Sequence, residues 1–352
     1  MSAQPVVTGR VAPLRIGVLG CGGIAMRRML PAMARTPAVR IAAVASRDRA
    51  RAQTAAARFG ADPVHGYERL LERDDIAAVY VPLPPALHAP WTARVLKAGK
   101  HALVEKPMVT AASEARDLAG LAEEGRLVLM ESFMFLHHSQ HATVTALLER
   151  GEIGELRGMT AEFGFPPLPA DDIRHRPELG GGALLDAGVY TLRVTQLLLG
   201  GALSVAGTTL AADAATGVDV GGDALLRGDS GVTSHVSFGF RHSYRSAYTL
   251  WGSAGRIVLD RAFTPPPEHR PVLRIERQDR VEELTLPADD QFANIAARFA
   301  ALVRGDGDPA TQRAAAVRQA ELVDAVRTAA VRQPETADAA RAATRPRPGS
   351  PP

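Results

Sequence analysis

The sequence predicts a two-domain α/β protein: a parallel, doubly wound sheet, followed by an α+β domain with a largely antiparallel sheet. Three observations predict this fold class. Strand-like and helical segments alternate as far as about residue 134, strand-like runs then follow one another without long helices between them, and a glycine-rich segment joins the first strand to the first helix. We place the first domain at residues 13–134 and the second at 135–332, between a flexible leader (1–12) and a disordered tail (333–352).

Short apolar runs alternate with helical segments in the first domain. Such runs are typical of strands buried on both faces, and right-handed crossovers between them make a doubly wound sheet. The predicted strands are Leu14–Leu19, Val39–Ala45, a short one at Val64, Ile76–Leu83, His101–Val104 and Leu127–Met130. The predicted helices are Ile24–Arg35, Asp48–Phe59 with Gly60 as its C-terminal cap, Tyr67–Arg73, Pro90–Ala98 and Ser113–Glu124.

The second domain has a different pattern. Strand-like runs without long helices between them indicate mainly antiparallel pairing. They are predicted at Leu156–Phe165, Ser204–Leu210, Asp223–Leu226, Val232–Phe240, Ala247–Trp251, Arg256–Leu259 and Leu273–Gln278. Helices are predicted at Gln140–Arg150, from the glycine turn at 180–182 through Leu199, and at Gln291–Val303 and Thr311–Val331.

The composition is that of an ordinary globular protein. Of the 352 residues, 46% are hydrophobic and 22% are charged, with a net charge of +3, and arginines are interleaved with acids, so we expect no nucleic-acid partner. Cys21 is the single cysteine, which excludes an intramolecular disulfide and fits a reducing compartment. Residues 1–10 have no signal-peptide core, and Asp186 and Arg193 interrupt the best membrane candidate, so we expect a cytoplasmic protein without membrane contact.

The segment after the first strand has the pattern G-x-G-x-x-A. Because it follows a predicted strand and opens a predicted helix, it indicates a dinucleotide site. The first glycine permits the tight turn, the second lets the backbone approach the pyrophosphate, and the alanine lets the helix lie close to the strand. Free amides at the helix start bind phosphate. The residues are Gly20, Cys21, Gly22, Gly23, Ile24 and Ala25.

The end of the second strand indicates which cofactor is bound. An NAD site places an acid there for the ribose 2′-hydroxyl, whereas this strand ends in Ala45, Ser46 and Arg47. A hydroxyl and a guanidinium suit a 2′-phosphate, so we predict NADP (NADPH). Asp48 is the competing candidate for the acid, but it lies at a predicted helix N-cap, which explains it without a cofactor.

Two further motifs carry a resemblance to a known family. Glu105-Lys106-Pro107 ends the fifth strand, and residues 180–190 read GGGALLDAGVY. With the glycine motif they resemble the glucose–fructose oxidoreductase / inositol dehydrogenase (Gfo/Idh/MocA) family over residues 13–332. The resemblance implies a Rossmann domain beside an open-faced antiparallel sheet that carries the substrate site. By analogy it also implies a dimer or tetramer.

A narrower resemblance is to the sugar-nucleotide 3-ketoreductases of deoxysugar and antibiotic biosynthesis. Those enzymes reduce the C3 ketone of a dTDP-linked 3,4-diketo-2,6-dideoxyhexose with NADPH. His175 stands where they usually carry tyrosine, and Ser132 where many have asparagine, which leaves the sugar open. The matching segments are residues 79–89, 130–141, 171–190, 251–256 and 261–271.

The resemblance implies catalytic roles for Lys106, Asp186 and Tyr190. The Lys106 ammonium, at the carboxyl edge of the sheet, would polarise the substrate carbonyl. Tyr190 would donate the proton. Asp186, four residues earlier on the same helix face, would orient Lys106 or hydrogen-bond the nicotinamide ribose or the substrate.

Other assignments follow from the same resemblance. Cofactor contacts are expected from Leu83 and His88, in a loop after the fourth strand, and from Glu105 and Arg174. A capping or core role for His88 and a surface position for Arg174 are the alternatives. Tyr244 and Arg245 are predicted to hold the diphosphate of the nucleotide-linked sugar.

Alternative functions stay open at this point. His137 and His141 have a spacing that can suit zinc, and His138 lies between them, but no further ligand follows at a recognisable spacing, so we predict no metal. An NADP-dependent dehydrogenase of free sugars or trans-dihydrodiols is one alternative function. A non-catalytic NADP-binding regulator is another, which retention of Lys106, Asp186 and Tyr190 disfavours.

Overall fold

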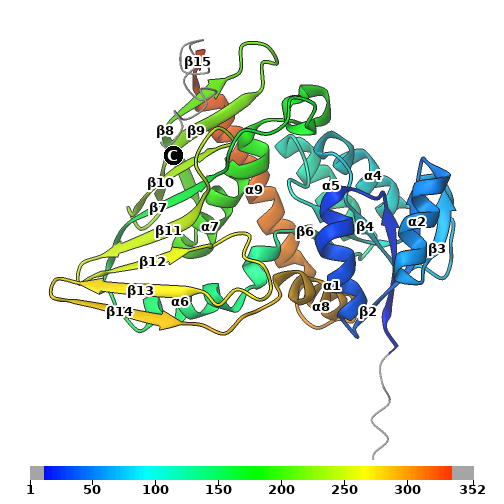
Figure 1. The fold of residues 1–352 in the computed structure, drawn as a ribbon, viewed down its shortest axis with the longest axis horizontal. Helices are drawn as coiled ribbons and strands as arrows, with labels where there is room; N and C mark the ends of the chain where they lie inside the picture. The colour runs from blue at the N-terminus through cyan, green and yellow to red at the C-terminus, as the bar shows by residue number, and fades with distance from the viewer. Residues whose placement is uncertain (1–11, 335–352) are drawn as a thin grey trace, which may run out of the picture.

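The computed structural model describes residues 12–334 and contains two sheets (Figure 1). The predicted leader and tail therefore lie almost wholly outside the described residues. The first sheet has the order β3-β2-β1-β4-β5-β6, and all of its strand pairs are parallel. The predicted doubly wound sheet is confirmed. Its strands are β1 Leu14–Leu19, β2 Val39–Ser46, β3 Asp62–His65, β4 Ala78–Val81, β5 His101–Glu105 and β6 Leu129–Ser132.

The helices of the first domain agree with the prediction to within two residues at each end, apart from two larger differences. The first helix opens with a π-helical turn, Ala25–Met29, before α1, Leu30–Arg35. The helix predicted from Pro90 begins instead at Pro85, because the first turn of a helix accepts proline without losing a hydrogen bond. The remaining helices are α2 Arg49–Phe59, α3 Tyr67–Leu71, α4 Pro85–Lys97 and α5 Ala112–Glu124.

The second sheet has nine strands in the order β14-β13-β12-β11-β7-β10-β9-β8-β15. It is mainly antiparallel, as predicted, with parallel pairs at β7–β10 and β8–β15. β14 and β15 are not predicted from the sequence, and β15 contains the predicted start of the tail. The strands are β7 Leu156–Gly164, β8 Leu203–Ala212, β9 Asp219–Gly228, β10 Thr233–Gly239, β11 Arg245–Gly252, β12 Arg256–Asp260, β13 Val272–Arg277, β14 Arg280–Thr285 and β15 Val331–Pro334.

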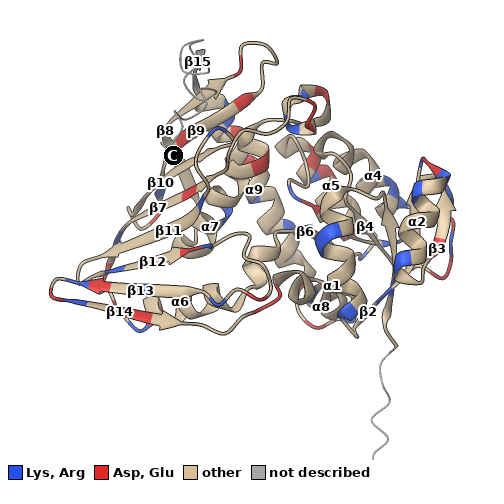
Figure 2. Ribbon diagram, viewed as in Figure 1, with Lys and Arg blue, Asp and Glu red and all other residues tan. Residues whose placement is uncertain are grey.

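Charged residues are distributed over both domains. Figure 2 shows basic and acidic positions interspersed along the ribbon, without a long stretch of one sign. Within residues 12–334, no helix combines the length and the apolar character that crossing a membrane requires.

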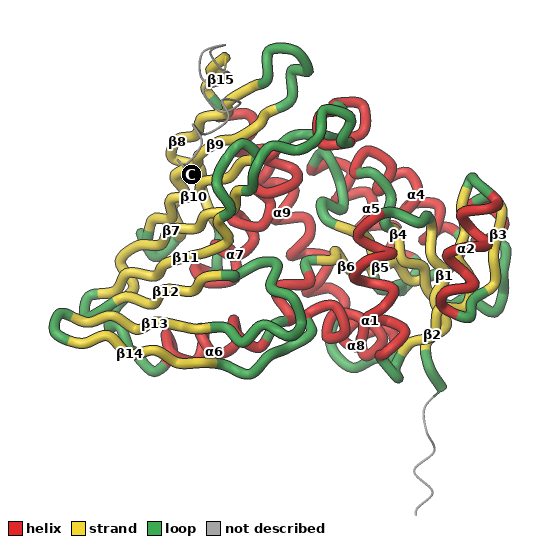
Figure 3. Tube along the Cα trace, viewed as in Figure 1, coloured by secondary structure: helices red, strands yellow, loops and turns green. Residues whose placement is uncertain are grey.

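Helices of the second domain lie between its sheet and the first domain (Figure 3). α9 contacts β8 of the second sheet and also β6 and α5 of the first domain. One continuous apolar core includes residues of both domains, such as Ile16, Phe135 and Leu322. The two domains are therefore packed as a unit, which fixes the edge of the first sheet relative to the second. The helices are α6 Ser139–Glu149, α7 Val189–Leu199, α8 Gln291–Val303 and α9 Pro309–Ala329.

Candidate active site

A cavity of about 660 Å³ lies where the two domains meet. Its walls include the carboxyl ends of the parallel strands, the glycine turn at 180–182, the start of the following helix, and Arg261 and Thr264–Pro266 after β12. Ligands of open α/β sheets bind at the carboxyl edge, next to the point where the strand order reverses. Here that point lies between β1 and β4, so the cavity adjoins the expected cofactor crevice.

The glycine motif has the geometry that a pyrophosphate requires. Gly20 has φ +105°, a conformation that favours glycine, and a β-carbon on Gly22 would lie 2.9 Å from the carbonyl oxygen of Pro82. The backbone at Gly22 therefore passes too close to the neighbouring loop for any side chain. The fit supports a dinucleotide at this edge, with Ile24 reaching the cavity.

The end of β2 supports the expected cofactor choice. The Asp48 carboxylate accepts hydrogen bonds from the amides of Ala50 and Arg51, at 2.8 and 3.1 Å, so it caps α2 as predicted. The Ser46 hydroxyl accepts one from the Asp48 amide at 3.1 Å. Because the acid is engaged by the helix, Ser46 and the exposed Arg47 are the side chains available to a ribose 2′-substituent.

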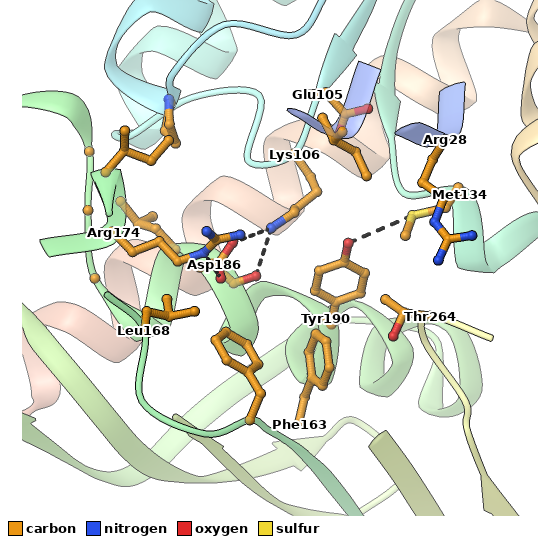
Figure 4. A pocket seen from close by; sticks show the side chains of 18 of the residues that line it. Arg28, Glu105, Lys106, Met134, Phe163, Leu168, Arg174, Asp186, Tyr190 and Thr264 are labelled. Atoms are coloured by element: carbon orange, nitrogen blue, oxygen red, sulfur yellow. Dashed lines mark hydrogen bonds and ion pairs between the residues drawn. The ribbon is translucent and has the colours of Figure 1, made fainter. Parts of the chain in front are cut away.

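Lys106 and Asp186 form an ion pair on the cavity wall (Figure 4). The Lys106 ammonium donates to the Asp186 carboxylate at 2.9 Å and to its backbone carbonyl at 2.8 Å. An ammonium has three N–H groups, so one remains for a ligand. Asp186 lies in a second π-helical turn, Leu184–Gly188, which precedes α7. The pair joins the edge of the first sheet to the second domain.

Arg174 completes this charged group. Its guanidinium donates to Asp186 at 2.5 Å and to Asp172 at 3.1 Å. Burial by itself would raise the pKa of Asp186, but Lys106 and Arg174 outweigh it and lower the pKa to about 2. Asp186 is therefore a fixed negative charge near neutral pH. Arg174 lines the cavity and is engaged by two carboxylates, and its contact with a cofactor stays a prediction.

Tyr190 lies beside Lys106 on the same wall. The Lys106 nitrogen is 4.9 Å from the centre of the Tyr190 ring, and the Tyr190 hydroxyl makes a weak contact with the Met134 sulfur at 3.7 Å. Burial, together with the charges of Glu105 and Asp186, raises the pKa of Tyr190 well above its usual value. The phenol therefore keeps its proton at neutral pH. Four phenylalanine rings pack around it: Phe133, Phe135, Phe163 and Phe263.

Glu105 lies immediately before Lys106 and also lines the cavity. It accepts a hydrogen bond from the buried Tyr80 hydroxyl at 2.7 Å. Burial raises the pKa of Glu105 despite the opposing effects of Tyr80 and Lys106. The bond from Tyr80, on the neighbouring strand, holds the end of β5 in place and thereby helps to position Lys106.

Comparison with known proteins agrees with this geometry. The model described as "Oxidoreductase family, NAD-binding Rossmann fold" matches residues 14–133, and that of the GFO/IDH/MocA C-terminal domain matches residues 141–258. The chain belongs to the GFO/IDH/MocA oxidoreductase family. The family and the fold class predicted from the sequence are confirmed.

Several relatives within the GFO/IDH/MocA family are similar over nearly their full length. The dTDP-3,4-didehydro-2,6-dideoxy-α-D-glucose 3-reductase of Saccharopolyspora spinosa is 53% identical, covering 89% of this chain and 96% of that protein. The crystal structure of KijD10, a 3-ketoreductase from Actinomadura kijaniata in complex with NADP and TDP-benzene, has a TM-score of 0.90 at 48% identity, covering 92% of this chain and 100% of that one. The D-xylose 1-dehydrogenase (NADP(+)) 2 of Haloferax volcanii is 33% identical, covering 89% and 96%.

Within this family framework, His88 has a different setting from the one predicted. It lies inside α4 and not in a loop, because the helix begins at Pro85. Its ring nitrogens are 2.7 Å from the Pro107 carbonyl oxygen and 2.6 Å from that of Leu83. Burial lowers the pKa of His88 to about 4, so the ring is neutral and donates to one of the two carbonyls. His88 and Leu83 both line the cavity, and His88 connects Leu83 to the Lys106-Pro107 segment.

The structure does not bring Arg245 to the cavity. Arg245 pairs with Glu162 at 3.0 Å and Asp260 at 2.9 Å on the exposed face of the second sheet, and it does not line the cavity. The reason is strand alternation: its neighbour Ser246 faces the core, so Arg245 faces away. Tyr244, just before β11, does line the cavity, and its hydroxyl is 3.4 Å from that of Thr264.

Two arginines on the cavity wall are missed by the sequence reasoning. Arg28 lies four residues after Ile24, and both reach the cavity. That spacing on the helix that opens at the glycine motif is a signal that could have found it. Arg261 follows β12 and opens the segment 261–271 that carries the narrower resemblance, which is a signal that could have found it.

The remaining candidates lie away from the cavity. His141 is buried, with its ring nitrogens 3.0 Å from the Tyr248 hydroxyl and 3.0 Å from the Ala262 carbonyl oxygen. Burial lowers the pKa of His141 to about 3, so it is a neutral core residue. Among residues 12–334, no group of histidine, cysteine and acidic side chains could hold a metal ion. Ser132 is buried beside Glu105 in the sheet, and His175 packs edge-on against Phe240.

Proposed function

We propose that this chain uses NADPH to reduce the C3 ketone of a dTDP-linked 3,4-diketo-2,6-dideoxyhexose in deoxysugar biosynthesis. The observation that carries the proposal is the pair of proton-bearing groups, Lys106 and Tyr190, on one wall of the cavity at the carboxyl edge of the first sheet. The similarity to a dTDP-sugar 3-reductase and to KijD10 supports this substrate class.

The residues at the edge of the first sheet fit NADP. The close approach at Gly22 suits a pyrophosphate, and Ser46 with Arg47 suits a 2′-phosphate. NADPH supplies the hydride when it is bound there. Arg47 and the cradle at Gly20 and Gly22 bind and orient it without taking part in the chemistry.

The cavity residues have complementary roles in ketone reduction. The free N–H of Lys106 would polarise the ketone and stabilise negative charge on its oxygen, since preorganised donors act most strongly where charge develops. Asp186 holds that ammonium in place through two contacts, at 2.8 and 2.9 Å. Tyr190 keeps its proton because of its raised pKa and would transfer it to the oxygen. The Lys106 ammonium is the second possible donor.

The test is to supply the purified protein with NADPH and the nucleotide-linked diketo sugar. We expect NADPH oxidation together with a new hydroxyl at C3, identified by NMR. D-xylose and a trans-dihydrodiol, each with NADP, serve as competing substrates. Turnover of either one without turnover of the nucleotide-linked sugar would replace this proposal with a free-sugar or dihydrodiol dehydrogenase.

A further inference from the structure

We infer that Arg28 and Arg261 form the subsite for the diphosphate of the nucleotide-linked substrate. This inference rests on the proposed function, because it assigns two residues to the charged part of that substrate. It takes the place of Arg245, which faces away from the cavity.

The positions of the two arginines support this assignment. Both line the cavity, Arg28 from the π-helical turn Ala25–Met29 of the first domain and Arg261 from the segment after β12 of the second. In the view of Figure 4, Tyr190 lies between Lys106 and Arg28. A substrate with its ketone at Lys106 and Tyr190 would thus extend its remaining part toward Arg28.

The charges on the cavity wall differ in whether they are neutralised. Arg174 and Lys106 share the Asp186 carboxylate. In the part of the chain that the structure describes, neither Arg28 nor Arg261 has a carboxylate partner, although both border the same cavity. A diphosphate would supply the missing negative charge. The guanidinium group suits it because its N–H groups can bond to two phosphate oxygens at once.

The backbone at Arg261 is a second, independent observation. Arg261 has φ +53°, in the left-handed region that residues with a β-carbon seldom adopt. Its guanidinium lies 5.0 Å from the centre of the Tyr244 ring, and Tyr244 itself lines the cavity. A strained non-glycine residue at a cavity rim is typical of ligand contacts, since glycine would satisfy the turn at lower cost. Tyr244 acts as a positioning residue that holds the Arg261 guanidinium at the rim.

The test is calorimetric titration of the NADPH-loaded protein with dTDP and, separately, with thymidine, which lacks phosphates. Arg28→Ala and Arg261→Gly should each weaken dTDP binding ~10–100-fold, the range for a lost hydrogen bond to a charged group, and should change thymidine binding much less. Arg261→Gly relieves the left-handed strain, so its melting temperature should not fall. This separates lost binding from lost folding.

The matched control is Arg40→Ala. Arg40 is exposed near the amino end of β2, remote from Ser46 at the other end of that strand, and it does not line the cavity. The Arg40→Ala variant loses one positive charge, as each of the two cavity variants does. Any general electrostatic effect on dTDP binding would therefore appear in this variant as well. We expect its dTDP affinity to be unchanged.

Each outcome has one meaning. If the unaltered protein binds dTDP and both cavity variants bind it equally well, the inference is overturned and the proposed function stands. If Arg28→Ala weakens NADPH binding and not dTDP binding, Arg28 belongs to the cofactor site and the inference is likewise overturned. If the unaltered protein does not bind dTDP, the proposed function fails together with the subsite.

Discussion

The two sides of the cavity use the same kinds of basic side chain in opposite ways. On one side, Lys106 and Arg174 are held by the carboxylate of Asp186. Arg28 lies on the other side of Tyr190 from Lys106 (Figure 4), Arg261 lines the same cavity, and neither has a carboxylate partner among the described residues. A paired cation is fixed in position, which suits a group that must meet a reacting atom. An unpaired cation keeps its charge available, which suits recognition of an anionic ligand.

The largest effect is expected for Lys106, the cation that is paired with Asp186. Lys106→Ala should lower turnover by about 10³-fold or more, because it removes the donor that stabilises charge on the ketone oxygen. NADPH binding should persist, since its phosphates are held at the glycine motif and at Arg47. Steady-state turnover and NADPH titration measure the two quantities, and Lys97→Ala, at an exposed position of α4, is the matched control. Near-normal turnover would remove Lys106 from the mechanism.

Tyr190→Phe should have a smaller effect, of about 10²-fold on the chemical step, because Lys106 or water can also supply a proton. The ring and its packing survive, and the hydroxyl loses only a 3.7 Å contact with the Met134 sulfur, so the melting temperature should not change. Single-turnover NADPH oxidation measures the step, and the double change with Lys106→Ala should lose much more than Tyr190→Phe alone. An unchanged step would make Tyr190 a packing residue and leave Lys106 as the donor.

The third prediction concerns Asp186, the acid that pairs with both Lys106 and Arg174. The pKa of Asp186 is lowered from 3.8 to about 2, so its contribution to stability is present above pH 4 and is lost as the pH falls through 2. This difference in the pKa of Asp186 corresponds to about 2 kcal/mol of unfolding free energy. Denaturant unfolding at several pH values should show this acid-dependent loss, and Asp186→Asn should lack it.

The control for that measurement is Asp279→Asn, in the exposed turn between β13 and β14. It changes the same functional group without touching Lys106 or Arg174. An unaltered acid dependence in Asp186→Asn would contradict the assigned coupling between these charges.

The smallest effect is expected for Arg47, a third arginine that we compare with Arg28 and Arg261. Arg47 is exposed at the end of β2, and it has no carboxylate partner within residues 12–334. We expect NADPH to bind at least ~10-fold more tightly than NADH, since a guanidinium favours the 2′-phosphate. Arg47→Asp should reverse much of that preference, as fluorescence titration with both cofactors would measure. Equal affinity of the unaltered protein for the two cofactors would exclude the assignment.

Local patterns in the sequence were sufficient for most of the first domain. The predicted strand Leu14–Leu19 and the predicted end of the second helix at Phe59, with its Gly60 cap, agree with the structure. These features depend on neighbours along the chain: apolar runs, caps and the spacing of glycines. The position of Lys106 could also be predicted from the sequence. It directly follows a predicted parallel strand, and the carboxyl ends of such strands form the edge where ligands bind.

Long-range contacts decided the rest of the site. Asp186 meets Lys106 across 80 residues of sequence, and its π-helical turn is not visible in the spacing of side chains. Arg245 and Arg261 are both arginines near strand ends, yet only Arg261 reaches the cavity. The sequence by itself determined the fold class and the dinucleotide motif, and its resemblance to the family predicted the roles of Lys106, Asp186 and Tyr190. Only the tertiary structure decided which arginines face the cavity. Successive side chains of a strand point to opposite faces of the sheet, and which face is buried depends on what the sheet packs against.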